Sequence, residues 1–129
     1  MTTDYKYSDL TEKIIKCFYK VYNALGYGFL EKVYQNALLI ELHNSGLSVE
    51  SQKQIKVFYN ESVVGEYYAD IVANNCVILE LKAAEAVVEE HEFQLINYLK
   101  ATETEVGLLL NFGKVPEIRR KVFTNPNQR

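Results

Sequence analysis

The sequence predicts a mixed α/β domain in which helices cover a central sheet. Two observations carry this expectation: the chain opens with two amphipathic helical patterns, and short apolar runs bounded by turn residues follow them. With 129 residues the chain is long enough for one domain and too short for two. We therefore expect a single domain over residues 1–123 and a polar carboxy-terminal tail over residues 124–129.

Two helices are expected before the strands. Apolar residues recur at helical spacing over residues 10–25, and Ser8 or Asp9 is the expected cap. A second helix is expected over residues 30–44, because Gly46 stands where a glycine that ends a helix belongs. These two patterns predict a pair of helices packed on one sheet.

The hydrophobic period then changes to that of strands. Residues 49–59 and 63–72 form the two arms of an expected hairpin, and Asn74-Asn75 supplies a second turn. Residues 76–82 are apolar on both faces until their end, which is typical of a central strand. The remaining expected elements are a helix over residues 88–101, a buried strand over 106–111 and a short strand or helix near 119–123.

Composition narrows the class of protein. No apolar run reaches the roughly 18 residues that a membrane span requires, and the amino terminus lacks the pattern of a signal peptide, so we expect a cytoplasmic protein without membrane contact. The two cysteines, Cys17 and Cys76, have no paired spacing, which argues against a structural zinc site. The net charge of −3 neither requires nor excludes a nucleic-acid partner.

Charged residues at the end of a buried strand are the most informative pattern. Strand side chains alternate, so Glu80 and Lys82 project from one face while Leu81 points away. Asp70 stands among apolar residues of the preceding strand, and the turn between the strands would bring it beside Glu80. Such groups are costly to bury unless they are paired or bind a metal.

Two interpretations of these charges stay open. Two ionised carboxylates repel each other unless a cation lies between them, and their oxygen ligands suit Mg²⁺ or Mn²⁺. Glu80 and Lys82 alone would equally well form a salt bridge, and the same acid-x-lysine spacing occurs at Asp4 and Lys6 in the polar amino-terminal segment. Asp70 on the paired strand brings the metal site to equal standing with the salt bridge.

Two further polar groups would complete a site. Glu31 and Tyr34 lie one turn apart at the start of the second helix, where helix capping and core packing are the alternative explanations. His91, Gln94 and Tyr98 share one face of the later helix and could bind phosphate oxygens, water or the carboxylates. A helix edge hydrogen-bonded to the sheet is the alternative for that face.

In combination these motifs resemble those of a known superfamily. The segment Gly28-x-x-Glu31-x-x-Tyr34 resembles the motif of the GxxExxY family, which is placed in the PD-(D/E)xK nuclease superfamily. Gln94-x-x-x-Tyr98 is similar to the glutamine–tyrosine motif of the RecB-like exonuclease branch. The resemblance extends over nearly the whole chain.

The core motif of the superfamily matches residue by residue. Asp70 and then Glu80-x-Lys82 occupy its charged positions, and only Ala69 departs from it, standing where the superfamily name has proline. The resemblance implies the restriction-endonuclease-like three-layer fold, with a mixed sheet of four or five strands flanked by helices in the order ααβββαβ and an optional last strand. It also implies hydrolysis of phosphodiester bonds in DNA or another nucleic acid by water that Mg²⁺ or Mn²⁺ activates.

The resemblance also assigns roles to residues. The implied metal ligands are Asp70, Glu80, the Leu81 carbonyl and Glu31, directly or through water, and Lys82 is the implied catalytic lysine. The residues implied to bind or orient the substrate are Gln94, Tyr98, Tyr34 and His91.

Two functions of other classes remain as rivals. One is a non-catalytic module that binds nucleic acid or protein and keeps the nuclease fold. The other is a dimeric structural protein, since several of the ten tyrosines, such as Tyr59, Tyr67 and Tyr68, are expected at the surface. A nuclease of this length is expected to need a second copy or a partner protein to hold its substrate.

Overall fold

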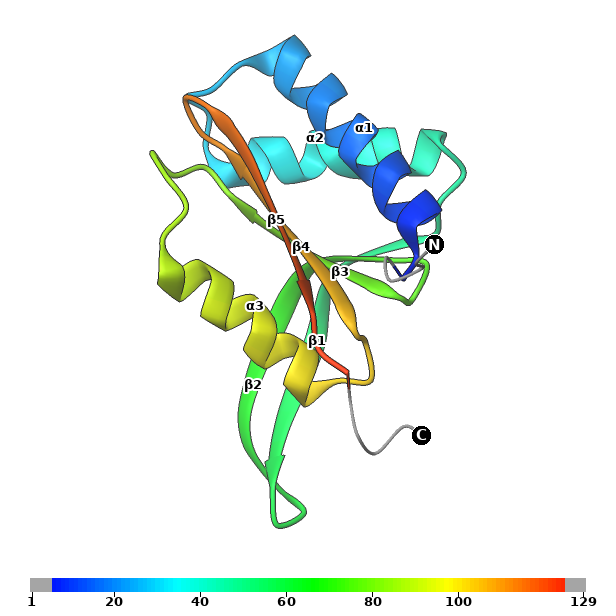
Figure 1. Cartoon of the computed structure of the whole chain (residues 1–129), viewed down its shortest axis with the longest axis vertical. Helices are drawn as coiled ribbons and strands as arrows, with labels where there is room; N and C mark the ends of the chain where they lie inside the picture. Colours follow the sequence, from blue (N-terminus) through cyan, green and yellow to red (C-terminus); the bar gives the residue numbers. More distant parts are fainter. Residues whose placement is uncertain (1–5, 125–129) are drawn as a thin grey trace.

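The computed structural model describes residues 6–124 and shows a five-stranded mixed sheet with helices on both faces (Figure 1). The elements follow in the order α1 (Ser8–Leu25), α2 (Glu31–Asn44), β1 (Val49–Tyr59), β2 (Ser62–Ala73), β3 (Val77–Lys82), α3 (Glu89–Ala101), β4 (Val106–Phe112) and β5 (Pro116–Val122). The predicted class and order are confirmed, and the closing element is a strand. Most of the predicted tail, residues 125–129, and Asp4 lie outside the described residues.

The strands lie in the order β1-β2-β3-β4-β5. Only β3 and β4 are parallel, and every other neighbouring pair is antiparallel. Parallel neighbours need a crossover connection, which α3 provides. Strand β3 is the middle strand, and its apolar residues on both faces are buried, as its sequence predicts.

Each face of the sheet has its own apolar core. Helices α1 and α2 cover one face, which we call the α1–α2 face, and its core includes Phe18, Leu38 and Leu79. Helix α3 covers the other, the α3 face, with Ile78 and Leu95 in its core. Within residues 6–124, no helix has both the length and the apolar character of a membrane span.

The chain turns at residues with left-handed backbone. Gly26 (φ 71°) follows α1, and Gly46 (φ 86°) follows α2 as predicted, because glycine adopts this conformation without steric cost. Asn74 and Asn75 both have positive φ, which is typical of the tight hairpin turn that links β2 to β3. The predicted cap of α1 is wrong: Tyr7 occupies the N-cap position and caps by no side-chain bond, since Ser8 is already helical.

Candidate active site

The ends of β2 and β3 are joined by side chains instead of a continued backbone ladder. The ladder stops after the pair Ile71–Leu79. At the next position, Glu80 Oε2 accepts a hydrogen bond from Asp70 N–H at 3.0 Å, and Asp70 Oδ2 accepts one from Leu81 N–H at 2.8 Å. These reciprocal bonds fix the two carboxylates beside each other, so the hairpin does bring Asp70 next to Glu80.

Strand β2 changes faces at Asp70. Ala69 packs on the α3 face and Ile71 packs on the α1–α2 face, although residues two apart normally share a face. Opposite this point Gln52 has a φ of 52°, and neither Gln52 nor Asp70 is paired in the β1–β2 register. The Asp70 carbonyl accepts a hydrogen bond from Gln35 Nε2 at 3.2 Å, so a side chain replaces the missing backbone partner.

Glu80 and Lys82 lie on the α3 face. Ile78 packs in the α3-face core and Leu81 in the core of the opposite face, so the alternation along β3 carries Glu80 and Lys82 to the side of α3. Glu80 is only 5% exposed. The ammonium of Lys82 lowers the pKa of both Asp70 and Glu80, which places its charge within reach of the pair.

Burial makes the carboxylate pair electrostatically unfavourable. Burial, together with the charge of Asp70 and more weakly that of Glu31, raises the pKa of Glu80 from 4.5 to about 8. Burial also raises the pKa of Asp70, against the opposing effects of the Leu81 N–H and the Lys82 charge. Positive charge bound between the two groups would relieve this penalty.

The donor set fits a hard divalent cation. Asp70 and Glu80 offer only oxygen, and Mg²⁺ is commonly held by one or two carboxylates while it keeps several water molecules. Within residues 6–124 no group of three or more His, Cys, Asp and Glu side chains could hold a metal. Glu31 is therefore not assembled as a third direct ligand, because it lies on the exposed first turn of α2. Contact between Glu31 and the cation through a water molecule remains a prediction.

The charged start of α2 nevertheless influences the carboxylates. The charge of Glu31 acts on Glu80, and the charge of Lys32 lowers the pKa of Asp70. Both side chains are exposed. The structure thus adds Lys32, which the sequence motifs did not single out, as a second positive charge near the pair.

Tyr34 does not reach a surface where a substrate could touch it. Its side chain is fully buried and stacks on Phe112, with ring centroids 4.4 Å apart. Its hydroxyl donates to the Gly26 carbonyl at 2.6 Å and accepts from Phe29 N–H at 3.1 Å. The predicted role in binding substrate is corrected to that of holding the loop between α1 and α2, which leads into Glu31.

Two glutamines that sequence reasoning missed support Asp70. Gln35 is 5% exposed and binds the Asp70 carbonyl, as described above. Gln52 donates to Gln35 Oε1 at 3.5 Å, and a hydrogen bond from its side chain lowers the pKa of Asp70. A polar residue directly after Tyr34, on the buried side of α2, was the available signal for Gln35.

Helix α3 carries the remaining predicted residues to different places. Tyr98 is 6% exposed, and burial with the charges of Glu80 and Asp70 raises its pKa to about 12, so the charges of the pair act on it. Gln94 is partly buried and lines a groove together with Tyr98. His91 instead stands at the start of α3, where its Nδ1 accepts a hydrogen bond from Val88 N–H at 3.3 Å.

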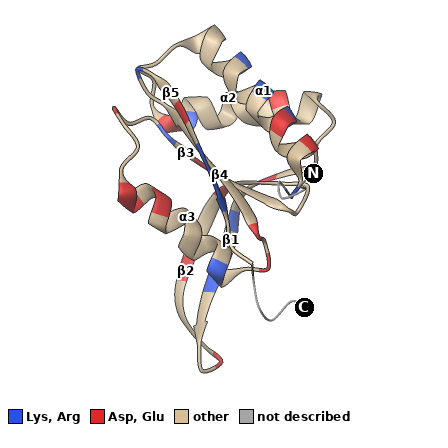
Figure 2. Cartoon of the chain, in the orientation of Figure 1, with Lys and Arg blue, Asp and Glu red and all other residues tan. Residues whose placement is uncertain are grey.

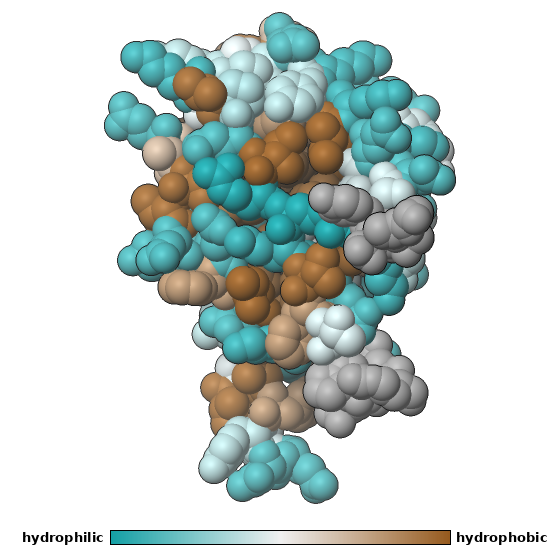
Figure 3. Space-filling model, viewed as in Figure 1, coloured by the Kyte–Doolittle hydropathy of each residue, from teal (hydrophilic) through white to brown (hydrophobic). Residues whose placement is uncertain are grey.

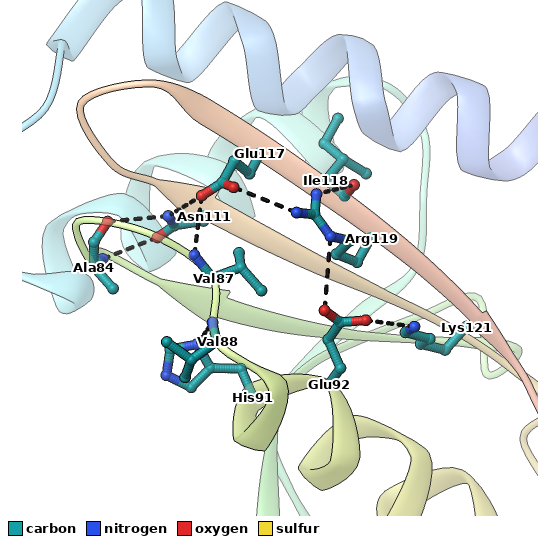
Figure 4. Close-up of polar contacts among 10 residues, drawn as sticks. All are labelled: Ala84, Val87, Val88, His91, Glu92, Asn111, Glu117, Ile118, Arg119 and Lys121. Carbon is teal, nitrogen blue, oxygen red and sulfur yellow. Dashed lines mark hydrogen bonds and ion pairs between the residues drawn. The ribbon is translucent and has the colours of Figure 1, made fainter.

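A polar network holds the connection from β3 to α3 (Figure 4). Asn111 is fully buried; its side chain pairs with both the N–H and the carbonyl of Ala84, and Glu117 accepts from Val87 N–H. The acidic start of α3 faces the basic strand β5 (Figure 2), and Glu92 forms ion pairs with Arg119 and Lys121 there. These contacts fix α3, and with it Tyr98, over the α3 face.

Comparison with known proteins decides the family. The family model described as the PD-(D/E)XK nuclease superfamily matches residues 8–122, which is nearly the whole chain. The chain belongs to the PD-(D/E)XK nuclease superfamily. Asp70, Glu80 and Lys82 lie within the matched region of this superfamily member, and nucleic acid is the substrate class that the superfamily implies. Among curated proteins, no match was found.

A solved structure supports the fold. The crystal structure of SSO0001 superposes with a TM-score of 0.60 at 18% sequence identity, and the match covers 91% of this chain. The chain spans 60% of the length of that protein. At this identity the likeness concerns the fold alone, and it agrees with the restriction-endonuclease-like architecture expected of the superfamily.

Proposed function

We propose that the chain is a metal-dependent nuclease whose centre is Asp70, Glu80 and Lys82. The reciprocal bonds between the ends of β2 and β3 carry this proposal, because they hold two carboxylates together at a cost that a bound cation would offset. No purely structural purpose requires both acids there, since a continued backbone ladder would satisfy the same amide groups.

Each residue has a distinct role in this proposal. Asp70 and Glu80, with the Leu81 carbonyl as a further oxygen donor, would hold Mg²⁺ or Mn²⁺, which when bound supplies an activated water and neutralises charge on the phosphate. Lys82 would donate hydrogen bonds to the phosphate oxygens as negative charge develops on them. Tyr98 and Gln94 would orient the nucleic acid or the metal-bound water.

We also propose that the chain belongs to the GxxExxY family and to the RecB-like branch of the superfamily. The spacing of Gly28, Glu31 and Tyr34 supports membership of the GxxExxY family, and Gln94 with Tyr98 on α3 supports the RecB-like branch. DNA is the substrate to test first. A second copy or a partner protein would add surface for holding the substrate to that of this 129-residue chain.

A cleavage assay tests the proposal. Purified protein is incubated with labelled single- and double-stranded DNA and RNA in Mg²⁺, in Mn²⁺ and in EDTA. We expect cleavage only with metal, and a loss of roughly 100-fold or more in D70N and K82A. Asparagine at position 70 still presents an oxygen to Leu81 N–H, so D70N should fold. K56A, which removes an exposed lysine of β1, is the matched control and should cleave normally.

The opposite outcomes are equally clear. Cleavage in EDTA, or equal rates for wild type, D70N and K82A, would contradict the proposal. Binding of oligonucleotide that needs no metal and survives E80Q, with no cleavage under any condition, would establish the non-catalytic module instead. Circular dichroism spectra of all variants exclude misfolding as the cause of any loss.

A further inference from the structure

A groove lies between α3 and the outer half of the β1–β2 hairpin. Its volume is about 560 Å³, within the range of roughly 300–1,000 Å³ that is usual for small-molecule sites. Val57, Phe58 and Tyr67 form the hairpin wall, and Gln94, Asn97 and Lys100 lie along the α3 wall. The hairpin projects past α3 (Figure 1), and hydrophobic side chains lie close to its tip (Figure 3).

The hairpin wall lies at a break in the strand register. Val57 pairs with Gly65 and Phe58 pairs with Val63, so Val64 is an extra residue of β2 at this point, which locally bends the hairpin. Val57 and Phe58, on the partner strand beside this bulge, both line the groove. Phe58 is 60% exposed and Tyr67 is 48% exposed, which leaves ring surface available to a ligand.

The chemistry of the two walls is complementary to an unpaired nucleobase. Aromatic rings stack on the face of any base, and the amides of Gln94 and Asn97 can donate to and accept from its edge. Lys100, whose ammonium lies 5.9 Å from the centre of the Phe123 ring, is the charged lining residue. None of the described residues that line the groove is acidic, although the chain has 17 acidic residues and a net charge of −3. That distribution suits a polyanion.

Tyr98 links the groove to the carboxylate pair. It lines the groove and packs against Tyr67 with ring centroids 5.6 Å apart, and the charges of Glu80 and Asp70 act on its hydroxyl. A strand whose base occupies the groove would thus lead its phosphates past the catalytic candidates. A base inside a duplex is already stacked and cannot enter such a groove.

We propose that the groove of Phe58, Tyr67, Gln94 and Lys100 binds an unpaired nucleobase, so that single-stranded nucleic acid is the substrate of the neighbouring site. This inference rests on the proposed function, because single-stranded nucleic acid is a substrate only if the chain is a nuclease. The binding step itself is independent of catalysis and can be measured without it.

Binding of oligonucleotides in EDTA tests the groove. Fluorescence anisotropy is recorded with labelled 15-nucleotide oligo-dT, oligo-rU and a 15-base-pair duplex at low salt. We expect the single strands to bind at least tenfold more tightly than the duplex, and Y67A to weaken single-strand binding about tenfold, because the stacking of one base on the ring is lost. Y67F keeps the ring and should bind within twofold of wild type.

Tyr68 provides the matched control. It is the next residue on the same strand and is 49% exposed, but it does not line the groove, so Y68A should leave affinity unchanged. Equal binding of duplex and single strands, no binding of either, or equal losses in Y67A and Y68A would overturn the inference. Preferential single-strand binding in D70N without any cleavage by wild type would leave the groove standing and remove the proposed function. Cleavage of duplex with no single-strand preference would do the reverse.

Discussion

At the residue scale, the pair Asp70–Glu80 is held where burial disfavours the ionised form of both carboxylates. Glu80 is buried, and its hydrogen bond comes from the backbone of Asp70, whose own carboxylate binds Leu81. Backbone amides that point at carboxylates favour the charged form, but here burial outweighs them. The site is therefore strained electrostatically in a way that a cation, a proton or a substitution should relieve.

The raised pKa of Glu80 predicts how stability depends on pH. Its pKa rises from 4.5 to about 8 on folding, so the folded protein binds a proton that the unfolded chain releases between these values. The contribution of Glu80 to the free energy of unfolding of the metal-free protein should therefore be greatest below pH 4.5. It should be lost as pH rises through 8. Thermal unfolding in EDTA at pH 5.5 and 8.5 measures the change.

The variant E80Q supplies the control for that experiment. Glutamine cannot ionise yet keeps an acceptor for Asp70 N–H, so the fall in melting temperature between the two pH values should shrink. A wild-type protein that is equally stable at both pH values, or an E80Q protein with the same fall, would contradict this interpretation.

Tyr34 gives a second prediction at this scale. Y34F keeps the ring that stacks on Phe112 but removes the hydroxyl that serves Gly26 and Phe29. We expect the free energy of unfolding in urea to fall by about 1–2 kcal/mol, because two partly buried backbone groups lose their partner. Y27F, at a tyrosine that is 56% exposed, should be neutral. An unchanged stability of Y34F would show that the hydroxyl does not hold the loop.

At the element scale, α3 lies close against β4 because Gly107 has no side chain. A Cβ at position 107 would lie 2.7 Å from Leu95 Cδ1, and Leu95 is fully buried. Leu95 stands between Gln94 and Tyr98 in the chain, so this close approach also sets the height of both residues above the sheet. Helix position and site geometry are thus coupled through one glycine.

The variant G107A tests this coupling. Overpacking should lower the free energy of unfolding by about 1–3 kcal/mol, and nuclease activity should fall with it because α3 is displaced. G65A is the matched control, since an added Cβ there would meet its nearest neighbour, a Tyr67 ring carbon, at an ordinary 3.6 Å. Stability and activity of G107A equal to those of G65A would show that α3 does not need this close contact.

The elements themselves could be predicted from the sequence, whereas several contacts could not. Hydrophobic period and turn residues predicted every helix and strand except the type of the closing element, which was left open between strand and helix, and they predicted that Asp70 lies beside Glu80. The face change at Asp70 was not predictable, because it accompanies an interruption of the pairing with β1, opposite Gln52. Gln35 and the Phe58 groove wall could not be predicted either, because burial and register arise only when the elements pack.

At the scale of the whole molecule, acidic and basic side chains gather on different elements although the net charge is only −3. Acidic side chains gather at the start of α3 and basic ones along β5 (Figure 2), where they pair with each other. The groove beside Tyr98 contains no acidic residue among those that line it. Net charge therefore says little about where a nucleic acid would bind, as the value of −3 already indicated.

The proposed nuclease site depends on a divalent cation bound by Asp70 and Glu80. Titration of Mn²⁺, followed by the loss of the free-ion signal in electron paramagnetic resonance, measures this binding. We predict saturable binding to the wild type that is abolished in D70N and in E80Q, with D9N at the exposed start of α1 as a neutral control. Binding of the same affinity in the wild type, D70N and E80Q, or no binding to the wild type, would contradict the account.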